Sequence, residues 1–202
     1  MNNLFSNFLL KEIKADTKKI LEDPYVSDLL LYRRLVSNAY DPTTGNSTPT
    51  YSYVSDINAL RGQYSLRDIA ASNGALAVGD RFYVFDPSVL SLVPEDDDRI
   101  LVKLTARGAV KVINGTSAVQ SANTYFLTDD VEPDDVLYVG EEFGRIQSVT
   151  AETGLVLTAA WSGTSSGLYV QGFAIYREFK LLDWQQDPLN ASLKVIVRKA
   201  GG

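Results

Sequence analysis

The chain has no cysteine and no histidine, and these two absences exclude most of the common catalytic centres. Without cysteine there is no disulfide and no thiolate nucleophile. Without either residue there is no Cys/His zinc site, no Ser-His-Asp triad and no Cys-His pair. An enzyme built from this sequence would have to work through carboxylates, Ser, Lys or Tyr alone. We therefore expect a protein that is not an enzyme and that holds no cofactor and no metal.

Long apolar runs and a surplus of positive charge are also missing. No stretch approaches the roughly 20 apolar residues that a membrane-spanning helix needs, so we expect no membrane partner. The first residues show neither a basic region ahead of the apolar ones nor a small-residue cleavage site, which argues against a signal peptide. There are 19 Lys and Arg against 25 Asp and Glu, a net charge of −6. That balance argues against a protein whose main task is to clamp phosphate backbones.

The composition that remains is that of an ordinary globular protein. Apolar residues make up 45% of the chain and charged residues 22%, which argues against disorder and collagen-like structure. With 202 residues the chain can bury a real core, as one large domain or as two small ones.

The first segment is the one long helix that the pattern predicts. Phe5, Leu9, Ile13 and Ile20 recur at helical spacing and form one apolar stripe. Pro24 ends the helix, because proline disfavours helical backbone in the residue before it. The sequence therefore predicts a helical arm over residues 1–24.

Two roles are open for this helix. Its apolar stripe either packs on the core of its own chain or serves as an arm that docks on a neighbouring subunit. Further apolar residues lie off the stripe, more than a single small domain would easily cover. In the arm interpretation, the residues expected at the subunit interface are Phe5, Phe8, Leu9 and Ile13.

After Pro24 the pattern changes to that of β-strands. Residues 29–36 and 51–57 are rich in β-branched, aromatic and leucine residues, and they flank the turn Asp41-Pro42-Thr43-Thr44-Gly45. Ser65 stands where it can cap a short helix. Closely spaced turn signals favour a barrel or a sandwich over a βαβ sheet. Further strands are expected at residues 81–85, 125–127, 136–139, 145–149, 155–157, 169–176 and 193–197.

Acidic residues concentrate in the middle of the chain. From Glu95 to Glu152 there are 12 acidic and 5 basic residues, which suggests a distinct module with an acidic face. Clustered carboxylates can bind calcium or act as a glycosidase pair. The segment from Asp129 to Asp135 does not match the calcium-binding loop, whose sixth position is Gly where this chain has Asp134. We interpret these residues as solvated loops, with a weak cation site and a catalytic carboxylate pair as the alternatives.

Residues 29–100 carry several motifs in a set order. The turn at residues 41–45 is followed by Gly62-Gln63-Tyr64-Ser65, by Gly79-Asp80-Arg81 ahead of a strand, and by Asp98-Arg99-Ile100. This order resembles the head-closure (stopper, or head–tail joining) proteins of tailed bacteriophages, which are small β-barrels. The strand pair that completes such a barrel is expected here at residues 173–199.

The residues between these parts are similar to small β-modules of phage structural and tail proteins. Those modules usually have Pro-Gly-Asp where this chain has Pro133-Asp134-Asp135. The other matching segments are Asn114-Gly115-Thr116, Phe126-Leu127-Thr128, Gly144-Arg145-Ile146-Gln147-Ser148-Val149 and Leu155-Val156-Leu157. The expected fold is thus mainly β: an arm at 1–24, a small head-closure-like β-barrel at 25–100 plus 172–202, and an inserted acidic antiparallel β-module at 101–171.

The resemblance implies a structural virion protein of the phage neck, assembled in the bacterial host cytoplasm. Such proteins form a ring of six or twelve copies between the portal with its adaptor and the tail, close the DNA channel and provide the surface on which the tail docks. The expected partners are further copies of this chain, portal and adaptor proteins, and tail-terminator or tail-tube proteins. Packaged DNA would be touched only by non-specific contact in the channel.

Two alternatives remain open. A tail-completion, tail-terminator or baseplate protein could be built from the same β-modules. A carbohydrate-binding β-module would use Trp161 and the many tyrosines as its stacking platform.

Overall fold

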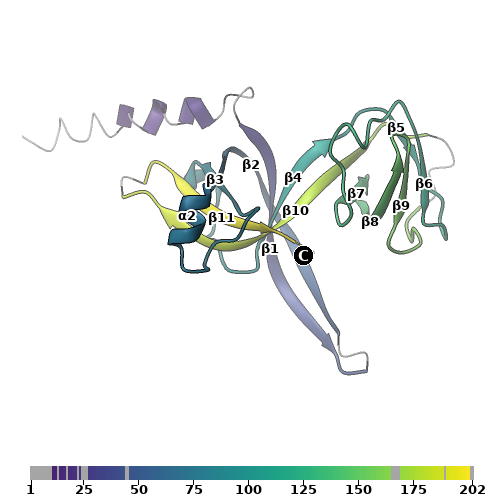
Figure 1. Cartoon of the computed structure of the whole chain (residues 1–202), viewed down its shortest axis with the longest axis horizontal. Coiled ribbons are helices and arrows are strands. Elements are labelled where there is room, and N and C mark those ends of the chain that lie inside the picture. Colours follow the sequence, from purple (N-terminus) through teal and green to yellow (C-terminus); the bar gives the residue numbers. More distant parts are fainter. Residues whose placement is uncertain are drawn as a thin grey trace, which may run out of the picture. The chain divides into compact units, whose positions relative to one another are not determined.

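In a computed structural model of the chain, strands dominate, and the protein is mainly β as the sequence predicts (Figure 1). The structure describes residues 11–12, 14–16, 18–21, 23, 27–43, 46–164, 169–188 and 190–200. The elements in chain order are β1 (Asp28–Asp41), β2 (Asn46–Gln63), α2 (Leu66–Ala71), β3 (Arg81–Phe85), the 3-10 helix η1 (Pro87–Val89), β4 (Arg99–Thr105), β5 (Ala109–Lys111), β6 (Ala118–Ala122), β7 (Val136–Val139), β8 (Glu142–Ala151), β9 (Gly154–Leu157), β10 (Phe173–Gln186) and β11 (Leu193–Lys199).

The strands form one large antiparallel sheet. Their order is β11-β3-β2-β1-β4-β10-β7-β8-β9-β6-β5. β10 also pairs with β11, from Phe179 opposite Lys199 to Gln186 opposite Leu193. This extra pairing turns part of the sheet back on itself as a partial ring.

The chain divides into two compact units. The first unit comprises Met1–Leu101 with Phe179–Lys199, and the second comprises Val102–Glu178 with Ala200–Gly202. The division passes through β4 and β10, so these two strands each contribute to both units. The residues expected as an arm, 1–24, are grouped with the first unit.

The core of the first unit is built from alternate positions of its strands. Successive side chains of a strand point to opposite faces, so alternating apolar residues bury one face of the sheet. The buried residues at such positions are Leu30 and Tyr32 of β1, Ile57 and Ala59 of β2, Tyr83 and Phe85 of β3, and Val195 and Val197 of β11.

The second unit has its own hydrophobic core. Its strands follow the order β10-β7-β8-β9-β6-β5, and the pairs are antiparallel. Val170 also forms a bridge to Val110 of β5. The buried cluster consists of Val110, Val112, Val119, Phe126, Val131, Leu137, Ile146, Leu155, Leu157, Trp161, Phe173 and Ile175.

The described residues between Lys11 and Leu21 are helical, as the sequence predicts. Leu21 is buried, with 2% of its surface exposed, whereas Ile20 is 55% exposed. Near the end of this segment, the Ser27 side chain donates a hydrogen bond to the Asp23 carbonyl (2.7 Å). Among its described residues, the helix is therefore anchored at its C-terminal end.

The strand prediction at residues 125–127 is wrong, and the one at 169–176 holds only for 173–176, where β10 begins. Residues 125–127 are expected to be extended, but the chain forms consecutive turns from residue 126 to residue 130. Asp129 N–H donates to the Tyr125 carbonyl (2.7 Å), and Val131 N–H to the Phe126 carbonyl (2.9 Å). Phe126 is fully buried in the core of the second unit. Its aromatic character therefore reflects packing under a turn and does not indicate a strand.

Candidate assembly interface

The β1–β2 hairpin is the most extended feature of the first unit. Its antiparallel ladder runs from Asp28 opposite Ala59 to Asp41 opposite Asn46, so the reversal lies at the turn that the sequence predicts. The distal end of the hairpin projects away from the other strands of its unit (Figure 1). Because a lone two-stranded hairpin is only marginally stable in water, this end depends on an anchor at its base or on a partner.

Asp98 is the anchor at the base of the hairpin. Its carboxylate is buried and accepts hydrogen bonds from the Tyr32 hydroxyl (2.5 Å), the Leu35 N–H (3.1 Å) and the Glu95 N–H (3.0 Å). Burial and the hydrogen bond to Asp98 raise the pKa of Tyr32 well above its ordinary value. The hydroxyl therefore stays protonated and keeps donating to the carboxylate.

Two register shifts lie beside this anchor. They fall between Tyr32 and Arg33 and between Leu35 and Ser37. Such bulges bend a strand and increase its twist, which redirects the hairpin where it leaves the body of the sheet. Arg34 lies between the two shifts, and its guanidinium pairs with Asp98 (3.4 Å). The base of the hairpin is thus fixed by both charge and backbone hydrogen bonds.

The distal part of the hairpin is exposed, apolar in places and almost uncharged. Val36, Tyr40 and Tyr53 are 63%, 64% and 62% exposed. Residues 35–55 contain a single charged residue, Asp41, whereas 22% of the whole chain is charged. Natural proteins usually protect exposed strand edges with charges such as Lys, because an unprotected edge pairs with other strands. This surface therefore has the chemistry of a strand-addition site.

The start of β3 is pinned to β11 by an ion pair. The buried Asp80 carboxylate accepts two hydrogen bonds from the Arg198 guanidinium, both 2.8 Å long, and one from the Ala77 N–H (2.7 Å). The hydrogen bonds from Arg198 hold the pKa of Asp80 below its ordinary value, although burial acts in the opposite direction. Gly79 has a φ of +95°, a backbone conformation that glycine adopts without strain. The Gly79-Asp80-Arg81 motif thus provides the turn before β3 and the carboxylate whose ion pair with Arg198 holds β3 to β11.

The short helix α2 begins as its sequence predicts. The Ser65 side chain accepts from the Asp68 N–H (3.2 Å), and the Asp68 carboxylate accepts in return from the Ser65 N–H (3.1 Å). This reciprocal pair is a capping box.

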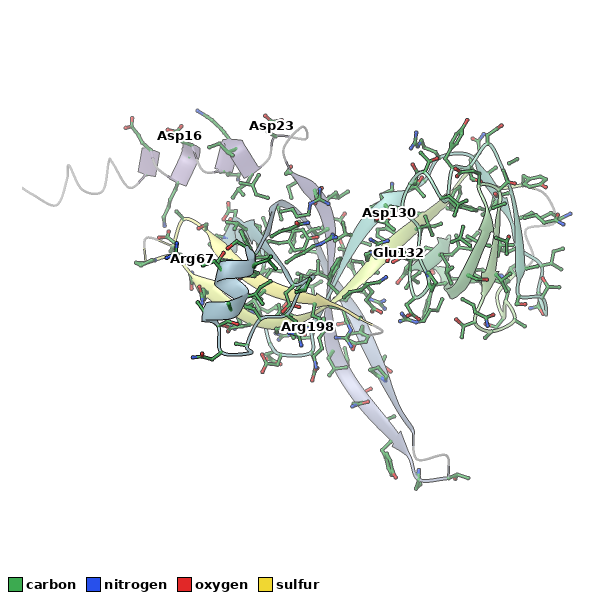
Figure 2. The ribbon with its side chains drawn as sticks, in the orientation of Figure 1. Asp16, Asp23, Arg67, Asp130, Glu132 and Arg198 are labelled. Atoms are coloured by element: carbon green, nitrogen blue, oxygen red, sulfur yellow. The ribbon has the colours of Figure 1, made fainter. Side chains whose placement is uncertain are left out.

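In the second unit, the acidic segment 129–135 is organised around one arginine. Arg177 of β10 donates to Asp135 (3.0 Å) and to Asp130 (3.1 Å), and lies 3.6 Å from Glu132. Figure 2 shows Asp130 and Glu132 close together. Burial by itself would lower the pKa of Arg177, but the hydrogen bonds and charges of these carboxylates outweigh it and raise the pKa.

The interpretation of these acids as solvated loops is therefore wrong for Asp135, which is fully buried against Arg177. Asp130, by contrast, is 75% exposed. The interpretation is also wrong for Asp129, whose side chain is only 6% exposed and pairs with the exposed Arg107. In the part of the chain that the structure describes, no group of three or more acidic side chains could hold a metal ion.

Trp161 cannot be the exposed stacking platform that the carbohydrate-binding alternative assigns to it. Its side chain is only 3% exposed and belongs to the core of the second unit. The indole N–H donates to the Thr164 carbonyl (3.2 Å), so the ring is fixed by packing and by a hydrogen bond.

Tyr125 and Tyr169 of the second unit are each 49% exposed, and two half-buried tyrosines pack against a third exposed ring. Tyr138 of β7 contacts Phe143 of β8 and Tyr176 of β10, with ring centroids 5.6 and 5.4 Å apart. Phe143 is 60% exposed. The planes of Phe143 and Tyr176 are inclined to that of Tyr138 by 31° and 83°, so the three rings do not form one flat surface.

The residues predicted at the subunit interface, Phe5, Phe8, Leu9 and Ile13, lie outside the residues that the structure describes. Compared with known proteins, the chain matches no family model and no curated protein. Among the described residues, no helix combines the length and the apolar character that crossing a membrane requires.

Proposed function

We propose that the chain is a structural protein of a phage neck, which assembles into a ring between the portal with its adaptor and the tail. The observation that carries this proposal is the β1–β2 hairpin, whose base is fixed by Asp98 and whose distal strands are exposed and nearly uncharged. A firmly held hairpin with unprotected edges is suited to pairing with strands of a neighbouring chain.

The sequence resemblance supports the same role. The motifs that carry it have identifiable tasks in the first unit: the turn at residues 41–45 closes the hairpin, Gly79-Asp80 starts and pins β3, and Asp98 holds the hairpin base. The β10–β11 pairing closes part of the sheet into a ring. This supports our proposal that the first unit is a small β-barrel.

In the ring, the hairpins and arms of neighbouring subunits join the copies, and loops close the DNA channel until a tail docks. The acidic second unit is an addition to this assembly. Its negative charge would keep it from adhering to DNA if it borders the channel.

The number of copies in each purified virion, measured by quantitative mass spectrometry, tests the proposal. We expect six or twelve copies, because a closed ring has a fixed small subunit number. Dozens to hundreds of copies would identify a tail-tube, fibre or capsid-surface protein, and absence from the particle would remove the structural role. A particle map then separates the neck from a tail end or baseplate.

A further inference from the structure

A narrow apolar groove crosses the surface of the first unit. It has a volume of about 130 Å³ and is lined by Leu90, Val93, Pro94, Trp184 and Leu193, among others. Leu90 and Leu193 form a buried floor, whereas Val93 is 61% exposed at the rim. An apolar cavity of roughly 150 Å³ accommodates one benzene molecule, so this groove has the size of a single aromatic ring.

A second, larger hollow adjoins the groove. Its volume is about 480 Å³, and Pro87 and Gln186 line both cavities. The larger hollow is bordered by Lys14, Ala15 and Lys18 of the N-terminal helix. The two cavities are thus neighbours, one bordered by the N-terminal helix and the other by Trp184.

The ten residues that precede Lys11 have the chemistry to fill such a groove. They contain no charged residue and include Leu4, Phe5, Phe8, Leu9 and Leu10. Large apolar side chains gain free energy when they leave water, about 1.5–3 kcal/mol each when fully buried. Either phenylalanine matches the groove in size and polarity.

We infer that the groove receives a phenylalanine from the N-terminal segment of a second copy of this chain. The helix is anchored at its C-terminal end by the buried Leu21, while most of its described residues from Lys11 to Ile20 are exposed. The described surface of this helix is therefore largely free of its own unit and available to a second copy. The arm and the groove are different surfaces, so their contact is heterologous, and a heterologous contact generates a ring when the rotation between successive copies closes. The inference rests on the proposed ring, of which it names one subunit contact.

The absence of cysteine provides a direct test with the full-length chain. Two variants, Phe8→Cys and Val93→Cys, are purified, mixed and oxidised. A disulfide that joins the two variants can form only between copies. We expect the mixture to give at least several-fold more covalent dimer than either variant alone. The matched control replaces Val93→Cys with Val78→Cys, a position in the same unit that is 80% exposed and does not line the groove.

Equal dimer yields with Val78→Cys and Val93→Cys would overturn the inference, since they would show random collision. A chain that carries both Phe8→Cys and Val93→Cys distinguishes the second copy from the chain's own arm. A monomeric intrachain disulfide as its main product would overturn the assignment to a second copy. If the specific dimer forms but virions lack the protein, the arm contact stands and the neck function fails.

Circular dichroism of every variant shows whether its β structure is retained. A second test needs no introduced cysteine. Native mass spectrometry compares the oligomers of the full-length chain with those of its Phe5→Ser/Phe8→Ser variant. We expect the variant to lose higher oligomers at concentrations where the original chain forms them. Unchanged oligomers in a folded variant would also overturn the inference.

Discussion

Asp80, Asp98 and Asp135 are buried carboxylates whose partners lie far away in the sequence. Asp80 pairs with Arg198 over 118 positions, Asp98 with Tyr32 over 66, and Asp135 with Arg177 over 42. In the sequence, Asp98 and Asp135 stand within acidic runs that look like solvated loops. Nothing local distinguishes the buried acid from its exposed neighbours, because its burial depends on where a distant strand places a donor. The role of Asp98 at the hairpin base therefore cannot be predicted from the sequence, although the Asp98-Arg99-Ile100 motif is visible there.

The Asp80–Arg198 pair predicts a pH-dependent contribution to stability. Asp80→Asn should lower the free energy of unfolding at pH 7 by about 1.5–3 kcal/mol, the range for hydrogen bonds to charged groups. The pKa of Asp80 is lowered in the folded state, so its contribution is fully present above the unfolded-state pKa of about 3.9. It is lost as the pH falls through the lower, folded-state pKa.

Urea unfolding of both proteins between pH 7 and pH 3 measures this contribution. The difference between them should stay constant down to about pH 5 and shrink at lower pH. Asp96→Asn, at an exposed acid of the same unit, is the matched control and should change stability by less than about 0.5 kcal/mol. A difference that grows on acidification would contradict the role assigned to Asp80.

At the scale of elements, strands bounded by clear turn signals were the most predictable. β3 and β7 begin and end at the residues that the sequence predicts, 81–85 and 136–139. The sequence does not predict β5 or β6, because each contains a single β-branched residue and no aromatic one. The error at residues 125–127 has another cause, since an aromatic residue can be buried beneath a turn as well as within a strand.

The hairpin yields a prediction about assembly. Val36→Lys/Tyr40→Lys should leave the fold intact, because both side chains are exposed, but should strongly reduce incorporation into virions. Lysine on an exposed strand discourages the addition of another strand. Complementation of a phage that lacks the protein, followed by quantification of the protein per particle, measures the effect. Leu66→Lys, at an exposed apolar position on α2, is the control and should be incorporated normally.

At the scale of the whole molecule, a chain without residues 1–22 should remain a folded β body. The buried cores described here come mainly from the strands, and Leu21 is the one described residue of the deleted segment that is buried. The shortened chain should nevertheless fail to enter particles, because it lacks the proposed contact with its neighbour. Circular dichroism and a count of copies per particle check both parts. Normal incorporation would contradict the arm hypothesis, and loss of the β spectrum would show that the segment belongs to the fold.

The chain enters the second unit through β4 and returns through β10, and these two strands are neighbours in the sheet. A domain inserted between adjacent strands disturbs the surrounding unit little, because the two points where the chain leaves and returns already lie close together. On the proposal that the second unit is an inserted module, residues 102–178 can be exchanged for another module while the first unit keeps the pairing of its own strands. Related chains that share the first unit should accordingly vary most in what they carry between β4 and β10.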